Sequence, residues 1–351
     1  MDTTMKAVIL NAPGSFEVGR VPVPRARRGE ALVRIHSVSI CGSDPKVIDR
    51  KLGGNWPPCY PFVIGHEFAG EVVATGEDVH KFKIGDRVAG EAHCGCGFCA
   101  NCMQGRYNIC LNYGRSDSGH RHYGFTYQGA YAEYNAYNIR ALTKMPDGVS
   151  YDEGTMCDTA GTSLNGIRLI GLTPGGFCVI VGPGPIGLCA MMLAKSMGSR
   201  TIVVGRGDRL AAAKRLGSDF IIHYEQEDVS ARILEITDGL GAHEALECAG
   251  NEQAANMAIL SLRRGGKVSL LGMPNAADMV LPIKKIVHDE IIVAGVRANP
   301  NCSDLVLGMM ANGALNVKGM ITHSFALEDF AQALDTFLCR KDGALKVVLH
   351  P

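Results

Sequence analysis

The sequence predicts an α/β protein in which a doubly wound parallel sheet accompanies a separate, mainly β part. From about Asp158 onward, short apolar segments alternate with helix-like segments, as in a parallel sheet covered on both faces. Before that point, strand-like segments are separated by turns, which is typical of an antiparallel barrel or sandwich. The chain of 351 residues is long enough for both domains.

The expected elements of the first part are short strands joined by turns. They lie at residues 5–10, 31–39, 69–75, 87–90 and 129–134. Farther along, strands are expected at 178–181, 201–204, 220–223, 244–248, 267–271 and 291–294, and helices at 164–169, 186–197 and 210–216. The chain ends with two helix-like segments and a strand at 346–349, an ending that can return to the first domain.

Composition and charge exclude several classes of protein. The 35 basic and 35 acidic residues cancel, so no net field favours nucleic acid or an anionic membrane. The longest apolar run, residues 178–194, contains prolines and glycines and is too short to span a bilayer comfortably. Without a targeting segment, the 13 cysteines indicate a reducing compartment rather than a disulfide framework. We therefore expect a cytoplasmic protein with neither a nucleic-acid nor a membrane partner.

A glycine-rich turn follows the apolar strand at residues 178–181. The first two glycines of such a turn let the backbone approach a pyrophosphate at a helix N-terminus, and the third lets the helix pack on the strand. Because the turn lies between a strand and a helix of a βα repeat, it predicts a Rossmann dinucleotide-binding domain. The residues expected to contact the cofactor are Gly182, Gly184, Pro185, Ile186 and Gly187.

The end of the next strand indicates which dinucleotide binds. NAD-binding domains usually carry an Asp or Glu there for the ribose 2′-hydroxyl, whereas this chain has Gly205 and Arg206. Gly205 leaves room, and Arg206 offers a charge-assisted pair to the 2′-phosphate of NADP. Asp208 lies just beyond and can turn back to the ribose, which keeps NAD as the alternative. We predict NADP.

Cysteine and histidine spacing predicts two metal sites. Four thiols lie within fifteen residues, an arrangement that closes a tetrahedral zinc site. They are Cys96, Cys99, Cys102 and Cys110. Cys94 is a further thiol two residues upstream, so a shifted set of ligands stays open. Cys41 and His66 lie well before this segment and indicate a separate, more open metal site.

The order of these motifs resembles that of the zinc-dependent medium-chain alcohol and polyol dehydrogenases, the group that includes sorbitol and threonine dehydrogenases. The motifs are C-G-S-D, G-H-E, G-D-R-V, the four-cysteine segment, G-A-Y-A-E-Y and G-P-G-P-I-G. The resemblance covers nearly the whole chain. It implies a GroES-like, mainly β catalytic domain with a structural zinc lobe, formed by residues 1–157 and 290–351. Residues 158–289 would form the Rossmann domain between these segments.

The resemblance also implies the ligands of a catalytic zinc ion. Cys41 and His66 match two of them, and Glu67 is similar to the family's glutamate that lies beside the metal and can exchange with water as a ligand. The third protein ligand of the family is a Cys, Glu or Asp just before the nucleotide domain, where Cys157 and Asp158 are adjacent. Matching Thr162 to the family's nicotinamide-contacting threonine selects Asp158, with Cys157 as the alternative.

Further roles and the assembly follow from the same resemblance. Ser43 occupies the position of the hydroxyl that passes the substrate proton outward, and Asp44 that of the carboxylate that orients the zinc-binding histidine. The four-cysteine lobe matches the family's structural zinc, so two zinc ions per chain are implied. Family members are usually dimers or tetramers, so we expect a homodimer or homotetramer.

These inferences predict an oxidoreductase that transfers a hydride between NADP(H) and a small secondary alcohol or polyol, or the matching ketone. Trp56 and the loop at 119–124 are candidates for contacts to a polar substrate, although the loop is equally typical of exposed surface. The alternative enzyme is an NAD-linked, threonine-dehydrogenase-like amino-alcohol dehydrogenase. Zero net charge argues against a zinc-ribbon nucleic-acid binder. The intact set of Cys41, His66 and Glu67 argues against a fold that has lost its activity.

Overall fold

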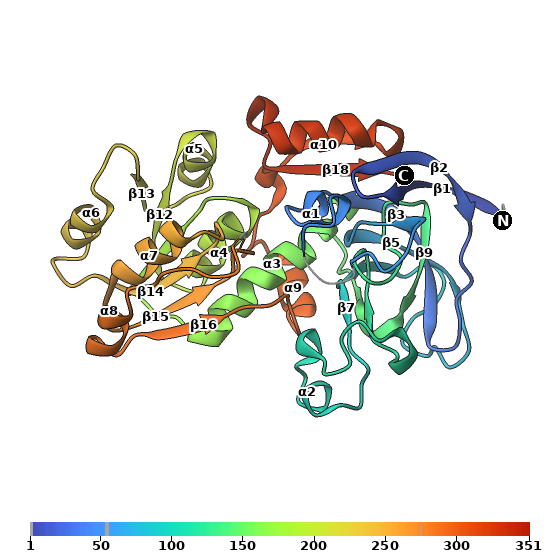
Figure 1. The fold of residues 1–351 in the computed structure, drawn as a ribbon, viewed down its shortest axis with the longest axis horizontal. Helices are drawn as coiled ribbons and strands as arrows, with labels where there is room; N and C mark the ends of the chain where they lie inside the picture. The colour runs from blue at the N-terminus through green and yellow to red at the C-terminus, as the bar shows by residue number, and fades with distance from the viewer. Residues whose placement is uncertain (1–2, 53–55, 275) are drawn as a thin grey trace. The chain divides into compact units, whose positions relative to one another are not determined.

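The computed structural model describes residues 3–52, 56–274 and 276–351. Within these residues the chain forms two compact units, which confirms the expected combination of a mainly β part and a Rossmann-type parallel sheet (Figure 1). The first unit comprises Met1–Asp158, Ser303–Ala311 and Met320–Pro351. The second comprises Thr159–Cys302 and Asn312–Gly319. No helix in the described part of the chain is long and apolar enough to cross a membrane.

The first unit is built mainly from short strands. Its strands are β1 (Thr4–Ala12), β2 (Ser15–Pro22), β3 (Glu30–Ser39), β4 (Phe62–Val63), β5 (Glu67–Thr75), β6 (Arg87–Gly90), β7 (His93–Cys94), β8 (Arg121–His122), β9 (Tyr134–Asn138), β10 (Leu142–Lys144), β17 (Ile321–Ala326) and β18 (Lys346–His350). The main sheet runs in the order β10-β6-β5-β3-β18-β17, with β9 also paired to β3. A second sheet has the order β2-β1-β4, and β7 pairs with β8.

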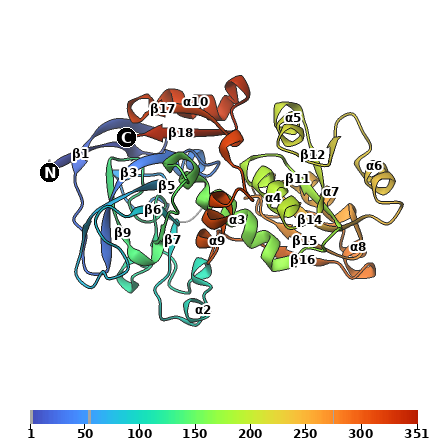
Figure 2. The same cartoon turned by 180° about the vertical axis from the view of Figure 1, so that it is seen from behind.

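Helices of the first unit are short. They are α1 (Asp44–Ile48), α2 (Ala100–Met103), α9 (Ser303–Ala311) and α10 (Phe330–Cys339), with 3-10 turns η1 (Tyr107–Ile109), η2 (Ser116–Ser118), η3 (Ile139–Ala141), η5 (Leu327–Asp329) and η6 (Lys341–Gly343). The 3-10 turn η4 (Lys318–Met320) crosses the unit boundary at Gly319. The lobe that carries α2 projects from the strands of this unit (Figure 2).

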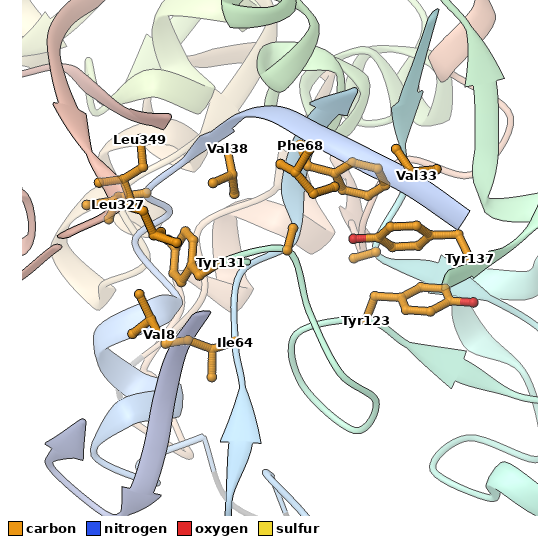
Figure 3. Packing of buried hydrophobic residues seen from close by; sticks show 14 of the residues in the cluster. Val8, Val33, Val38, Ile64, Phe68, Tyr123, Tyr131, Tyr137, Leu327 and Leu349 are labelled. Atoms are coloured by element: carbon orange, nitrogen blue, oxygen red, sulfur yellow. The ribbon is translucent and has the colours of Figure 1, made fainter. Parts of the chain in front are cut away.

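The core of the first unit surrounds β3. Because β3 pairs with β5, β9 and β18, nearly all of its residues are buried, and only Arg34 is exposed. Aromatic rings fill one side of this core, where Phe68 and Tyr137 stack with centroids 4.1 Å apart and Tyr123 lies 4.6 Å from Tyr137 (Figure 3). Leu349 brings β18 into the same cluster. The C-terminal strand therefore completes a core begun near the N-terminus.

The second unit is a parallel sheet with helices packed against it. Its strands are β11 (Phe177–Val181), β12 (Arg200–Gly205), β13 (Phe220–His223), β14 (Ala242–Glu247), β15 (Leu262–Leu270) and β16 (Ile292–Gly295). Its helices are α4 (Pro185–Ser196), α5 (Gly207–Arg215), α6 (Val229–Ile236), α7 (Glu252–Leu260) and α8 (Ile283–His288). The strand order is β13-β12-β11-β14-β15-β16, and every pair is parallel. The order reverses beside β11, where doubly wound sheets bind their ligands.

One helix, α3 (Tyr151–Ile170), contains the boundary between the units at Asp158 and Thr159. Residues 290–302, expected with the first domain, lie in the second unit because β16 pairs in parallel with β15.

Three local expectations differ from the structure. The strand expected at 129–134 is absent, and β9 begins at Tyr134. The backbone N–H groups of residues 129–131 donate instead to the carbonyls of residues 63–65, where chain segments approach closely at glycines. The helix expected at 164–169 is the last part of α3. The chain ending contains an unexpected strand, β17, whose residues alternate between half-buried and exposed.

Candidate functional site

Cys41, His66 and Glu67 come together because one strand ends where its antiparallel neighbour begins. β3 ends at Ser39, two residues before Cys41, and β5 begins at Glu67, directly after His66. Ser39 and Glu67 are opposite each other in the ladder. One donor atom from each of Cys41, His66 and Glu67 lies within 4.8 Å of the other two. A thiolate, an imidazole and a carboxylate are donors that zinc accepts, so the group fits this ion.

The turn before His66 requires glycine. Gly65 has φ +93°, and a Cβ there would lie 2.7 Å from the Tyr131 ring. The amide of Tyr131 donates to the Ile64 carbonyl at 2.9 Å, and that of Ala130 donates to the Gly65 carbonyl at 2.8 Å. The G-H-E motif thus combines donor residues with a backbone position that only glycine fits well.

Asp44 connects the loop of Cys41 to the ring of His66. Its Oδ2 accepts hydrogen bonds from the Cys41 amide at 2.8 Å and from the Tyr131 hydroxyl at 2.6 Å. Its Oδ1 lies 3.4 Å from Nδ1 of His66, and both side chains are buried. Burial lowers the pKa of the His66 imidazole, but Cys41 and Asp44 raise it, and the net result lies well above the ordinary value. A bound metal would take the place of that proton.

Glu67 is held in a buried ion pair. Its Oε2 accepts hydrogen bonds from the Ser39 hydroxyl at 2.7 Å and from Nζ of Lys346. The Glu67 and Lys346 side chains are each 2% exposed. Sequence reasoning missed Lys346. The available signal was a lysine beside the apolar residues of a strand, since a buried lysine needs a carboxylate partner.

Asp158 lies near this group on α3. Its carboxylate interacts electrostatically with His66, Glu67 and Lys346, and the backbone of Ala92 donates a hydrogen bond to it. Burial raises the pKa of Asp158 to about 6; Glu67 adds to this shift, and His66 and Lys346 oppose it. Asp158 is not in the set whose donor atoms all lie within 4.8 Å of one another. Its place as a third ligand therefore stays a prediction.

Cys157, the alternative ligand, faces a different neighbour. It is buried, and its Sγ lies 4.0 Å from the carbonyl oxygen of Ser303 at the start of α9. The Ser303 hydroxyl donates to Glu91 at 2.5 Å, and the Tyr107 hydroxyl donates to the same carboxylate at 2.6 Å. Burial raises the pKa of Glu91 to about 7. Glu91 thus joins α9 to the four-cysteine lobe, a link that sequence reasoning did not find.

Ser43 was predicted to pass on the substrate proton, and Thr162 was predicted to contact the nicotinamide. Ser43 lies directly before α1, and its Oγ is buried without a hydrogen-bond partner in the described part of the chain. Thr162 lies on α3, is partly buried and belongs to the second unit. The unpartnered hydroxyl of Ser43 is available to a ligand.

A stack of aromatic rings extends from His66. Phe125 lies 4.8 Å from His66 between centroids, and His122 stacks on Phe125 at 3.9 Å. Trp56 meets His122 edge-on at 5.9 Å, and Tyr113 hydrogen bonds to Nδ1 of His122. His122 belongs to the segment 119–124, which was predicted, like Trp56, to contact the substrate. Trp56 and this segment therefore both lie in the ring stack that begins at His66.

The four cysteines of the lobe have the geometry of a closed zinc site. All four sulfur atoms lie within 4.8 Å of one another in the group Cys96, Cys99, Cys102 and Cys110. The sulfurs of Cys96 and Cys102 are 3.9 Å apart, as are those of Cys99 and Cys110. Four sulfurs at 2.3 Å from a central zinc would be about 3.8 Å apart. These four thiols therefore fit the metal without rearrangement.

Local contacts shape the lobe around the thiols. A Cβ at Gly95 would lie 2.5 Å from the sulfur of Cys102, so glycine is required beside the cluster. The amide of Cys99 and the side chain of Asn112 each donate to the sulfur of Cys96 at 3.4 Å. Cys94, the alternative ligand, is buried outside the group, with its sulfur 3.8 Å from the Gly95 carbonyl.

The glycine-rich turn has the geometry that a pyrophosphate requires. Gly182 has φ +99°, and a Cβ there would lie 2.9 Å from Ala249. A Cβ at Gly187 would lie 2.1 Å from the Gly182 carbonyl oxygen, so the helix packs tightly on the turn. Gly184 is the N-cap of α4 and supplies no capping side chain, and Pro185 is the first helical residue. The turn thus fits a dinucleotide at the helix N-terminus.

The end of β12 carries the residues expected to select the dinucleotide. A Cβ at Gly205 would lie 2.4 Å from the Pro183 ring, so glycine is required for packing as well as for room. Arg206 forms an ion pair with Glu225 and lies 5.8 Å above the ring of Tyr224. Asp208 lies exposed in the first turn of α5. Sequence reasoning identified Arg206 but not its acidic partner.

Comparison with known proteins agrees with this geometry. Residues 27–147 match the alcohol dehydrogenase GroES-like domain, and residues 185–312 match the zinc-binding dehydrogenase domain. Over 349 residues the chain is 33% identical to sorbitol dehydrogenase from Bacillus subtilis strain 168, covering 99% of this chain and 97% of that protein. It belongs to the zinc-dependent medium-chain alcohol and polyol dehydrogenases.

Other members of this dehydrogenase family align equally fully. L-threonine 3-dehydrogenase from Bacillus licheniformis is 32% identical, with 100% of each chain covered. The crystal structure of an NADP-bound protein from Sinorhizobium meliloti 1021 superposes on this chain with a TM-score of 0.89. The two sequences are 26% identical, and 100% of each chain is covered. As a family member, the protein is an oxidoreductase acting on CH–OH groups of small molecules, with zinc and NAD(P) as its cofactors.

Proposed function

We propose that the protein transfers a hydride between NADP(H) and a small secondary alcohol or polyol, or the matching ketone. The observation that carries the proposal is the group of Cys41, His66 and Glu67, whose donor atoms lie within 4.8 Å of one another. Such a group can hold a zinc ion while leaving a place for a substrate oxygen.

Zinc is proposed at two places in the first unit. Cys41, His66 and Asp158 would hold the catalytic ion, with Glu67 adjacent and kept charged by Lys346. The four cysteines of the lobe would hold the structural ion, because two pairs of their sulfur atoms are 3.9 Å apart and all four lie within 4.8 Å of one another. We therefore propose two zinc ions per chain.

The chain's own side chains would divide the chemical work. The zinc ion supplies a Lewis acid that favours ionisation of the substrate hydroxyl, and the nicotinamide exchanges hydride. Asp44 lies beside Nδ1 of His66 and would orient the ring so that Nε2 is the atom left to hold the metal. Ser43 accepts the substrate proton and passes it outward. Thr162 is proposed to contact the nicotinamide.

The coenzyme proposal rests on the turn and on the end of β12. Gly182, Gly184 and Gly187 let the pyrophosphate approach the start of α4, where Pro185 and Ile186 form the first helical positions. Gly205 and Arg206, at the end of β12, are proposed to lie beside the adenosine ribose. A guanidinium forms a strong charge-assisted pair with a 2′-phosphate, which supports NADP.

A polar substrate is supported by the ring stack beside His66. Trp56 provides an aromatic wall, and His122 and Tyr113, which hydrogen bond to each other, make the same cluster polar. Such a surface suits an alcohol with further hydroxyl groups better than a bulky apolar one. The assembly into a homodimer or homotetramer remains a prediction from family membership.

One alternative has specific support. The chain is 32% identical to an L-threonine 3-dehydrogenase, and its Arg206 is already paired with a carboxylate. An NAD-linked oxidation of an amino alcohol such as threonine is therefore the second candidate.

A panel of polyols, secondary alcohols, amino alcohols and their ketones, each assayed with both coenzymes, tests the proposal. The absorbance of the reduced nicotinamide gives kcat/KM for each combination. We expect the highest values for a polyol or small secondary alcohol with NADP(H). Threonine oxidised efficiently with NAD would favour the alternative, and a panel without turnover by zinc-loaded protein would contradict both.

A further inference from the structure

Arg206 and Glu225 are brought together by the register of two parallel strands. β12 and β13 pair with Gly205 opposite His223, and the amide of Tyr224 donates to the Gly205 carbonyl at 3.2 Å. Arg206 follows Gly205 directly, and Glu225 follows Tyr224. Both side chains therefore extend from the carboxyl edge of the sheet, the edge that carries the glycine-rich turn.

The guanidinium of Arg206 already has an anionic partner. It pairs with the Glu225 carboxylate, and the Tyr224 ring lies 5.8 Å away. The Arg206 side chain is 57% exposed and that of Glu225 is 47% exposed, so solvent weakens the pair. A more highly charged anion can displace Glu225 as the partner of the guanidinium. The Glu225 carboxylate then remains close to that anion.

We propose that Glu225 is a coenzyme-specificity residue that competes with the 2′-phosphate of NADP for Arg206. This inference rests on the proposed NADP-linked function. A 2′-phosphate carries close to two negative charges, so it gains from the guanidinium but is repelled by an adjacent carboxylate. NAD carries a neutral hydroxyl there and is not subject to that repulsion. Glu225 therefore lowers the preference for NADP below the value that Arg206 alone would give.

Neighbouring charged residues are engaged differently. Glu227 accepts the backbone N–H of His223 at 2.7 Å and lies 3.8 Å from Arg232, so its carboxylate caps the end of β13. Arg209 lies by the turn itself, where its Nη1 would be 3.6 Å from a Cβ at Gly184. Glu225 is thus the carboxylate that the structure pairs with Arg206.

Direct binding measurements test this competition without requiring turnover. Dissociation constants for NADPH and NADH are obtained from nicotinamide fluorescence for the native chain, E225Q and E235Q. Removing a like charge near the phosphate should tighten NADPH binding about fivefold, whereas NADH binding should hardly change. The gain should shrink at high salt, because these groups are exposed. Glu235 pairs with Arg232 on α6, so E235Q controls for the loss of a surface charge.

An R206Q variant separates this inference from the coenzyme assignment itself. R206Q should weaken NADPH binding, and adding E225Q to R206Q should produce no further gain. If R206Q weakens NADPH binding while E225Q leaves it unchanged or shifts both coenzymes equally, the role of Glu225 is overturned and that of Arg206 stands. If R206Q binds NADPH as tightly as the native chain, both assignments are overturned.

Discussion

The ion pair of Glu67 and Lys346 places two charges where almost no water reaches them. Both side chains are 2% exposed, and the Ser39 hydroxyl satisfies the same carboxylate oxygen. Replacing such a pair by apolar groups can be harmless, but removing one member leaves a buried charge without compensation. Lys346 therefore stabilises the fold while it keeps the carboxylate next to Cys41 and His66 ionised.

A K346M variant should be strongly destabilised. The free energy of unfolding in urea should fall by about 3–5 kcal/mol, because the buried Glu67 carboxylate loses the positive charge that compensates it. The double variant K346M/E67Q should recover part of the loss, since glutamine can still accept the Ser39 hydrogen bond. K341M removes the partner of Asp335 from an exposed pair and should have no measurable effect. A K346M protein as stable as the native chain would contradict this account.

The residue types and their spacing predict which side chains could donate to a metal, but not which residues contact those side chains. Chemistry and motif order alone predict Cys41 and His66 as metal ligands, and the structure brings their donor atoms within 4.8 Å of each other. The partnership of Lys346 with Glu67 could not be predicted in this way, because it joins positions 279 residues apart and depends on β18 lying beside β3. Glu225 escaped notice for a similar reason: its proximity to Arg206 follows from the register of β12 and β13.

At the scale of elements, periodicity was most reliable in the second unit. The fully buried strand β11 and the turn after it are recognisable because apolar runs and glycines carry a local signal. The segment at 129–133 misled because its N–H groups do not form a continuous ladder: those of residues 129–131 donate to residues 63–65, and that of Glu133 donates to Lys6. The first half of α3 was missed because it contains glycine, threonine and aspartate, and its packing against Ala69 and Met145 overrides weak helix propensity.

The C-terminal strand is tied to α3 by a pair that should respond to pH. Nε2 of His350 lies 2.8 Å from Oδ1 of Asp152, which also accepts the Ser37 hydroxyl. The hydrogen bond that His350 donates to Asp152 raises the pKa of His350 and lowers the pKa of Asp152. A histidine whose folded pKa is raised contributes its stability below the unfolded value of about 6.5 and loses it as pH rises through the folded value.

An H350N variant should therefore differ from the native chain mainly at mildly acid pH. The difference in unfolding free energy should be about 0.5 kcal/mol near pH 6 and should vanish near pH 9, since both partners are partly exposed and screened. Urea titrations at the two pH values measure it. H323N serves as the control, because His323 hydrogen bonds to the Thr322 hydroxyl rather than to a carboxylate. A difference that grows with pH would contradict the assignment.

At the scale of the whole molecule, the residues proposed to hold the metal and those proposed to bind the dinucleotide belong to different units. The metal group of Cys41, His66 and Glu67 and the four-cysteine lobe belong to the first unit, together with Asp158. The glycine-rich turn, Arg206 and Glu225 belong to the second. Each of these sites takes its local geometry from contacts within its own unit. Metal loading and dinucleotide binding should therefore be separable by experiment.

Gradual removal of zinc by a chelator should abolish turnover before it affects coenzyme affinity. The catalytic ion is expected to leave first, because its proposed site has fewer thiolate ligands than the four-cysteine site. Zinc content should then fall from two ions to one per chain as activity disappears. NADPH fluorescence should still report an almost unchanged dissociation constant at that stage, and zinc added back should restore turnover. A loss of NADPH binding in step with the first zinc ion would show that the two sites are not independent.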